Sequence, residues 1–238
     1  MIYLSFDQDW APAWATEDLC TAVAAADQRG TFFVTHDCPS LEVLRSSGRF
    51  ELGWHPNYLP GSSHGEEVEA VLNTMHALVP KAVGARAHGL ITGTSYLLAY
   101  GARGLRYDAS ELRDGVHDLE VFTSWTGVQQ IPIFFEDDVH FARGRTCRLD
   151  RLELDRPGLK VFNFHPILLA LNASDTSGYK ALKQSLTSRG LSLNEATRED
   201  VAAFTQADAP GVGDLFRELL SWLERNPGQA GGTLSELC

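Results

Sequence analysis

Short hydrophobic runs alternate with longer amphipathic stretches along most of the chain. Runs rich in β-branched and aromatic residues predict strands, and alanine- or leucine-rich stretches with one apolar face predict helices. The predicted strands are 2–6, 31–35, 50–54, 82–85, 105–107, 131–135 and 159–164, and the predicted helices are 16–29, 40–45, 65–79, 179–188 and 213–225. Strands that alternate with helices favour a parallel sheet covered by helices.

Polar side chains follow five of these predicted strands at the point where each strand ends. They are Asp7 and Asp9, His55, Arg86 and His88, the acidic run 136–138, and His165. In barrels of parallel strands, active sites assemble at the carboxyl ends of the strands. The pattern therefore predicts an α/β fold, an irregular or distorted (β/α) barrel of mostly parallel strands, with its site at that end.

No repeat or linker divides the chain, so we expect one domain over residues 1–238, with the informative motifs within 2–168. Residues 112–156 show no clear period and predict long loops or antiparallel strands. The glycine-containing segment 228–232 predicts a flexible tail.

Composition narrows the classes of partner. The net charge is −11 and the pI about 5.1, which argues against nucleic acid or an anionic membrane surface as partner. No stretch approaches the roughly 18 apolar residues that a membrane span requires. The four cysteines are scattered without a CxxC pair, and no basic leader is visible. These features predict a cytoplasmic protein.

The segment Asp7-Gln8-Asp9 places two carboxylates two residues apart at the end of a strand. Two acids in one small volume repel each other unless a cation or a shared proton separates them. Asp9, His55 and His64 offer one carboxylate and two imidazoles, a set suited to a divalent transition metal with one position left for water. His36 follows another strand and could replace one of the histidines.

Three further residues suit acid–base chemistry. Arg86 could hold a catalytic carboxylate ionised and oriented. His165 suits a general acid or a stabilising group, and Asp137 or Asp138 could tune its pKa. Neither a GxSxG nucleophile elbow nor a glycine-rich phosphate loop occurs in the sequence.

In order along the chain, these residues resemble the motifs of the polysaccharide deacetylase family, which is also called the NodB-homology family or carbohydrate esterase family 4. Ser-Phe-Asp7-Gln-Asp9 is similar to the family's TFDDG motif, and Thr-Phe-Phe-Val at 31–34 to its ATFF strand. His55 with His64 stands where the family has its metal-binding histidine pair. Arg86 is similar to the arginine of the family's RxPxG motif, and His165 to the histidine of its LxH motif.

Two departures bear on the site. The family's two histidines are normally four residues apart, but position 59 is Leu59 and the next histidine is His64. His88 stands where the family usually has proline. These changes resemble the WbmS-like subgroup that is associated with lipopolysaccharide O-antigen synthesis.

The resemblance implies a metal-dependent N-deacylase that acts on an amino sugar in bacterial polysaccharide or O-antigen biosynthesis. Zn²⁺ is the expected ion, with Co²⁺, Ni²⁺ or Mn²⁺ as alternatives, held by Asp9, His55 and His64. Asp7 would be the base, and Arg86 would orient it. His165 would be the general acid that protonates the leaving amine, and Asp138 would position it. The substrate, an N-acylated sugar, would contact Trp10, His88 and Asp137.

Two alternatives stay open from the sequence. The same fold could hydrolyse a non-carbohydrate amide. The missing histidine at position 59 also leaves room for a sugar-binding barrel without catalysis. A glycosidase built on Asp7 and Asp137 would leave the histidines without a role.

Overall fold

The computed structural model describes all 238 residues and contains one sheet of nine strands. The strand order is β6-β7-β5-β4-β3-β2-β1-β9-β8, and all neighbours are parallel except β6 and β7. The strands are β1 (Ile2–Asp7), β2 (Gly30–Val34), β3 (Phe50–Trp54), β4 (Gly84–Ala85), β5 (Tyr107–Asp108), β6 (Phe122–Thr123), β7 (Gln129–Gln130), β8 (Ile133–Glu136) and β9 (Lys160–Phe164).

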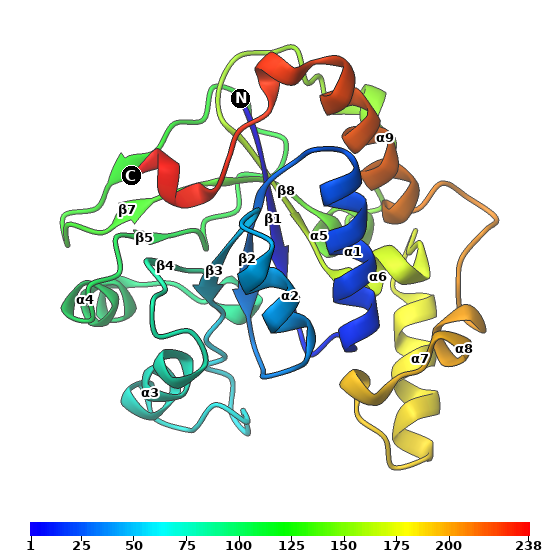
Figure 1. Ribbon diagram of the computed structural model, residues 1–238, viewed down its shortest axis with the longest axis horizontal. Coiled ribbons are helices and arrows are strands. Elements are labelled where there is room, and N and C mark those ends of the chain that lie inside the picture. Colours follow the sequence, from blue (N-terminus) through cyan, green and yellow to red (C-terminus); the bar gives the residue numbers. More distant parts are fainter.

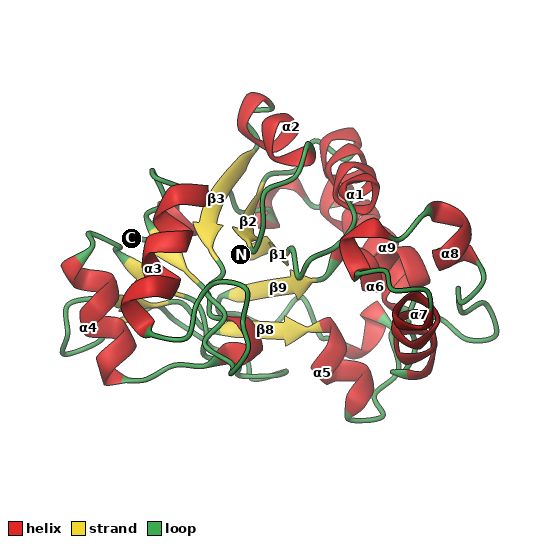
Figure 2. Ribbon diagram, turned by 90° about the horizontal axis from the view of Figure 1, so that it is seen from below, coloured by secondary structure: helices red, strands yellow, loops and turns green.

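Nine α-helices surround this sheet. They are α1 (Ala13–Ala25), α2 (Ser40–Ser46), α3 (Val68–Leu78), α4 (Thr94–Ala102), α5 (Asp137–Ala142), α6 (Pro166–Leu171), α7 (Ser177–Ser188), α8 (Arg198–Ala202) and α9 (Val212–Arg225). Figures 1 and 2 show α3 and α4 toward one edge of the sheet, with α1, α6, α7, α8 and α9 toward the other edge. None of the helices combines the length and the apolar character that crossing a membrane would need.

The sheet curls into a distorted half-barrel, which confirms the predicted fold class. A parallel bridge between Leu112 and Ile133 brings the chain after β5 against β8, so the two ends of the strand order approach each other. Side chains alternate along β1: Leu4 and Phe6 join the large core under the helices, while Tyr3 belongs to a smaller core inside the curl. Ser5 and Asp7 share the inner face with Tyr3, because every second side chain points the same way.

The close approach of β4 to β5 depends on a glycine. A Cβ atom on Gly84 would lie 2.0 Å from the ring of Tyr107, which is fully buried in the inner core. The absence of a side chain at Gly84 therefore makes room for this ring.

The first predicted helix ends earlier than expected, at Ala25 rather than Arg29. Asp27 adopts the left-handed conformation (φ 53°) and turns the chain. Gly30, which directly follows the predicted helix, is the first residue of β2, where a Cβ would come within 2.9 Å of Leu4 O. Close packing of β2 on β1 therefore explains this glycine.

Other differences lie in the regions with weak patterns. Helices α4, α5, α6 and α8 were not predicted, and the irregular middle contains the antiparallel pair β6–β7. The tail predicted to be flexible docks on β1: Gly231 N donates to Ile2 O at 2.7 Å, and Ala230 forms a bridge with Ile2.

Candidate active site

A fully buried arginine organises the inner face of the sheet at the carboxyl ends of the strands. Arg86 follows β4 and donates from Nη1 to Asp7 Oδ1 at 3.0 Å, from Nη2 to Ser5 Oγ at 2.9 Å and from Nε to Ala109 O at 2.9 Å. The guanidinium also lies over the ring of Phe33, 4.4 Å from its centroid. A buried charge needs such partners, and the network fixes the Asp7 carboxylate in one orientation.

Asn163 on β9 links Asp7 to a second buried acid. Its Nδ2 donates to Asp7 Oδ2 at 2.8 Å and to Glu136 Oε1 at 2.9 Å, while Arg86 donates to its Oδ1. A bulge in β8 pairs Phe135 with Phe162 and then Glu136 with Asn163, which shifts the register after Ile133. The extra residue changes the alternation, so Glu136 joins the polar inner face.

Asp9 lies just beyond β1, and the imidazole rings of two histidines contact its carboxylate. Its Oδ1 atom is 3.0 Å from His55 Nε2 and 2.9 Å from His88 Nδ1. Asp9 and Trp10 both have left-handed backbone conformations (φ 45° and 54°), which turn the chain out of the strand direction. Burial alone would raise the pKa of Asp9, but hydrogen bonds from His55 and His88 outweigh it and hold the pKa well below the usual value.

These three residues form a group that could hold a metal ion. One ligand atom from each of Asp9, His55 and His88 lies within 4.8 Å of the others. His55 Nδ1 is buried without a hydrogen-bond partner, 3.8 Å from Asp7 Oδ1. A carboxylate and two imidazoles are ligands that Zn²⁺ and related ions prefer, so the donor set fits the metal that the sequence implied.

His64, the expected third ligand, does not reach this group. Its Nδ1 accepts a hydrogen bond from Asn57 N at 3.0 Å, and its Nε2 is 2.7 Å from Thr35 O. Both ring nitrogens are therefore occupied by the backbone, which makes His64 a brace between two loops. His88 stands beside Asp9 instead. The alternative, His36, is also outside the group, with Nδ1 3.1 Å from Thr35 Oγ1.

His165 follows β9 and is held from one side by an acid. Its Nδ1 is 2.6 Å from Asp137 Oδ1, and its backbone N donates to Asp137 Oδ2 at 2.8 Å. Its Nε2 lies 3.5 Å from Asp9 Oδ2 and 4.0 Å from Asp7 Oδ2. Burial would lower the pKa of His165, but the charge and hydrogen bond of Asp137 outweigh it, and the pKa is well above the usual value.

Of the two neighbouring acids that could tune the pKa of His165, Asp137 is the one that contacts it, although Asp137 was also expected to contact the substrate. Asp138 is exposed and lines the cavities beside His165. The reason is local: α5 begins at Asp137, and its first turn directs the two side chains differently.

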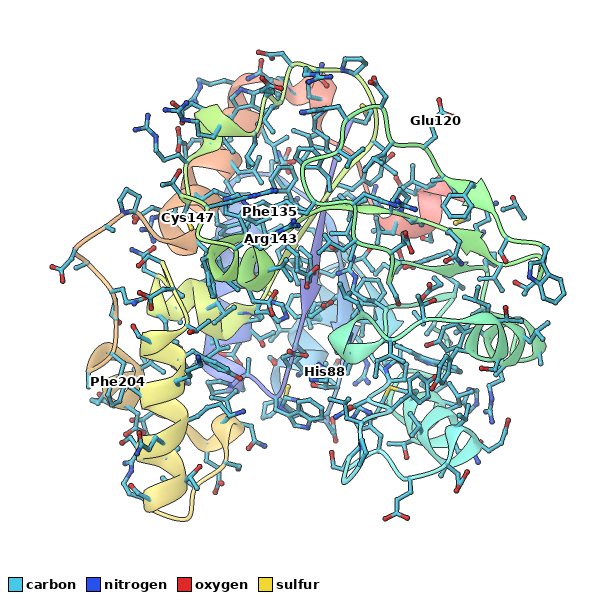
Figure 3. All side chains as sticks on the ribbon, turned by 180° about the vertical axis from the view of Figure 1, so that it is seen from behind. His88, Glu120, Phe135, Arg143, Cys147 and Phe204 are labelled. Atoms are coloured by element: carbon cyan, nitrogen blue, oxygen red, sulfur yellow. The ribbon has the colours of Figure 1, made fainter.

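Trp10 and His88, expected to contact substrate, lie next to each other. Their ring centroids are 5.4 Å apart in an edge-to-face arrangement, and Trp10 also lies 5.5 Å from the ring of His64. Trp10 therefore forms a wall of the histidine group. Figure 3 shows His88 in the lower half of the molecule, the half toward which β1 points in Figure 1.

Two cavities open on the reactive groups. The smaller, about 260 Å³, is lined by Asp7, Asp9, His55, His88, Gly89, Leu90, Glu136, Asp138, Val139 and His165. The larger, about 540 Å³, shares Asp9, Asp138 and His165 with it and extends to α7. The site therefore has room for a small substrate beside its acids and histidines.

Ser5 and Asn163 were not predicted as members of the network. The two-residue alternation gives a partial signal, because Ser5 shares a face with Asp7 and Asn163 with His165. Glu136 was expected at a strand end as part of the acidic run 136–138, but its direction depends on the bulge in β8 and could not be predicted.

Residues 4–183 match the WbmS-like family, described as polysaccharide deacetylase. The crystal structure of WbmS from Bordetella bronchiseptica, a candidate polysaccharide deacetylase involved in O-antigen biosynthesis, is 29% identical with a TM-score of 0.81. That match covers 93% of this chain and 90% of that one.

Two more distant structures also match. Peptidoglycan deacetylase PdaC from Bacillus subtilis is 12% identical with a TM-score of 0.45, covering 100% of this chain and 89% of its own. A family 4 carbohydrate esterase from Streptomyces lividans, in complex with acetate, is 14% identical with a TM-score of 0.43, covering 88% and 97%. No curated protein matches the chain.

Proposed function

Because this chain belongs to the WbmS-like polysaccharide deacetylase family, we propose that it is a metal-dependent hydrolase that removes an N-acyl group, acetyl in the first instance, from an amino sugar. The observation that carries the proposal is the convergence of two carboxylates, Asp7 and Asp9, with three imidazoles on one cavity. The similarity to WbmS supports a role in bacterial polysaccharide or O-antigen biosynthesis.

Asp9, His55 and His88 would hold the divalent ion, with Zn²⁺ as the first candidate. When bound, such an ion would polarise the amide carbonyl and lower the pKa of a water molecule toward about 7. His64 has no part in this ligand set, because both of its ring nitrogens bond to the backbone.

Asp7 would act as the general base. Arg86 donates to one of its carboxylate oxygens and Asn163 to the other, so the carboxylate cannot rotate. The positive charge of Arg86 also lies beside this carboxylate, 3.0 Å from Nη1 to Oδ1. Asp7 would take a proton from the attacking water as that water adds to the amide carbon.

His165 would act as the general acid. The bond to Asp137 occupies Nδ1, so the Nε2 proton points toward Asp7 and Asp9 and into the cavity. The raised pKa keeps the imidazole protonated near neutral pH. His165 would give this proton to the leaving nitrogen as the C–N bond breaks, which releases the free amine and the carboxylic acid.

The test is release of acetate from N-acetylated amino sugars, compared between the wild type and Asp7→Asn. Loss of a general base typically costs about 10²–10⁴-fold in rate. We expect a loss of that size in kcat while the metal content stays at the wild-type value, because Asp7 is not a ligand.

Two results would contradict the proposal. One is wild-type kcat in Asp7→Asn. The other is a metal-loaded wild type that releases acetate from simple amides but from no amino sugar, which would favour a non-carbohydrate amide as substrate.

A further inference from the structure

The larger cavity beside the reactive groups has an unusual charge distribution. Its lining consists of Asp9, Asp138, Phe141, Ala142, His165, Ile167, Leu168, Thr176, Tyr179, Lys180 and Lys183. We refer to this cavity as the lysine pocket. Both acids lie at the reactive end, on the β1 loop and on α5, whereas both lysines come from α7. Apolar side chains from α5 and α6 complete the wall.

The two lysines carry unpaired positive charge. Lys180 and Lys183 are three residues apart, so they share one face of α7. Neither ammonium group forms an ion pair or a hydrogen bond with another residue, and α7 contains no Asp or Glu, but Lys180 lies near enough to Asp175 to contribute to its lowered pKa. The contact that Lys183 does make is with the ring of Tyr179, 5.4 Å from Nζ to the centroid.

This placement stands out in so acidic a protein. The chain has 31 acidic residues and a net charge of −11, and its only lysines are Lys81, Lys160, Lys180 and Lys183. Half of the lysines thus line the cavity that shares Asp9 and His165 with the reactive cluster. Two neighbouring ammonium groups repel each other, and an anion between them would remove that repulsion.

We infer that the substrate is an amino sugar that carries an anionic group, a phosphate ester or a carboxylate, and that Lys180 and Lys183 bind this group while the amide lies at Asp7 and His165. The inference rests on the proposed function, which it deepens by naming the substrate class. A volume of about 540 Å³ is in the usual range for small-molecule sites, and Tyr179 offers a flat surface to the sugar ring. A neutral glycan would leave both charges without a partner.

Direct binding tests the inference without relying on catalysis. The probes are the expected products, glucosamine 1-phosphate and glucosaminuronic acid, each compared with neutral methyl glucosaminide by calorimetry on the metal-loaded protein. The galactosamine counterparts are run in parallel. The two anions distinguish a phosphate ester from a carboxylate as the bound group. We expect at least one anionic probe to bind more tightly than its neutral counterpart.

The variants are Lys180→Gln, Lys183→Gln and the double variant, with Lys81→Gln as the matched control because Lys81 is exposed and lies outside the pocket. A hydrogen bond to a charged group is worth about ten-fold or more in affinity. The double variant should therefore lose about 100-fold or more for the anionic probe and nothing for the neutral one, while Lys81→Gln changes neither.

Equal binding of anionic and neutral probes by the wild type would overturn the inference. Unchanged anion affinity in the double variant would also overturn it, because the anion would then bind elsewhere, for example at the metal. Acetate release is scored separately: anion binding at the lysines without hydrolysis would contradict the proposed function and leave the pocket assignment in place.

Discussion

Glu136 is an acid inside the barrel with one hydrogen bond, received at Oε1 from Asn163, while its buried Oε2 has no partner. Burial, and after it the negative charge of Asp7, raise the pKa of Glu136 well above its usual value. Folding therefore favours the protonated form of this acid. A second negative charge beside Asp7 would otherwise oppose the ionised base that the proposed mechanism needs.

This environment predicts a pH-dependent effect of Glu136→Gln on stability. Above the unfolded pKa of about 4.3, the folded state retains a proton that the unfolded state has lost. The free energy of unfolding of the wild type therefore falls as the pH rises from the unfolded pKa to the folded pKa. The Glu136→Gln side chain does not titrate, so the variant does not lose this stability. We expect the variant to gain more than about 1 kcal/mol relative to the wild type between pH 4 and pH 8.

Urea unfolding of metal-free protein at a series of pH values measures this change. Glu224→Gln is the control, because Glu224 is exposed and should show no such trend. A stability difference between Glu136→Gln and the wild type that stays constant from pH 4 to pH 8 would show that Glu136 has an ordinary pKa.

The sequence predicted the shared location of residues at the ends of strands better than that of residues in loops. Asp7, His55, Arg86 and His165 take their positions from β1, β3, β4 and β9, and the structure brings them together at one end of the sheet. Asp9, His64 and His88 depend on the paths of loops, which the hydrophobic pattern does not determine. The sequence therefore suggested His64 as a ligand, whereas the structure places His88 beside Asp9 and His55.

At the scale of elements, the curl of the sheet depends on tight contacts between neighbouring strands. Gly84 in the two-residue strand β4 packs directly against the Tyr107 ring, whose hydroxyl donates to Glu51 Oε1 at 2.9 Å. Arg86 leaves the same strand two residues later. The position of the arginine thus depends on how closely β4 and β5 approach.

Gly84→Ala should destabilise the fold by about 1–3 kcal/mol or more, because the added methyl overlaps a ring that cannot leave the core. Gly228→Ala serves as the control, since a Cβ there meets nothing within 4 Å. Urea unfolding of both variants gives the comparison. Equal stabilities for the two alanine variants would mean that the sheet is loosely packed at β4.

Elements with a strong period were predicted to within a few residues, as with β1, α7 and α9. Those set by tertiary contacts were not. The bulge in β8 and the short helix α5 that follows it determine where Glu136, Asp137 and Asp138 point. Neither feature has a hydrophobic period from which it could be predicted. The last third of the chain, which gave no motif, supplies α7 and with it both lysines of the lysine pocket.

For the molecule as a whole, the parallel sheet explains why residues 156 positions apart in the sequence share one site. Asp7 and Asn163 are such a pair, joined by a hydrogen bond of 2.8 Å. Parallel neighbours bring the carboxyl ends of β1, β3, β4 and β9 to the same end of the half-barrel, which Figure 2 views from below. The fold class was predictable for the same reason, because it follows from the alternation of strands and helices.

We propose that Asp9, His55 and His88 hold one divalent ion and that His64 does not. The most direct measurement is metal content by elemental analysis after loading with Zn²⁺ and dialysis, for the wild type, His88→Gln and His64→Gln. We expect about one ion per chain in the wild type and in folded His64→Gln, and loss of the ion in His88→Gln. Retention by His88→Gln with loss in a folded His64→Gln would contradict it.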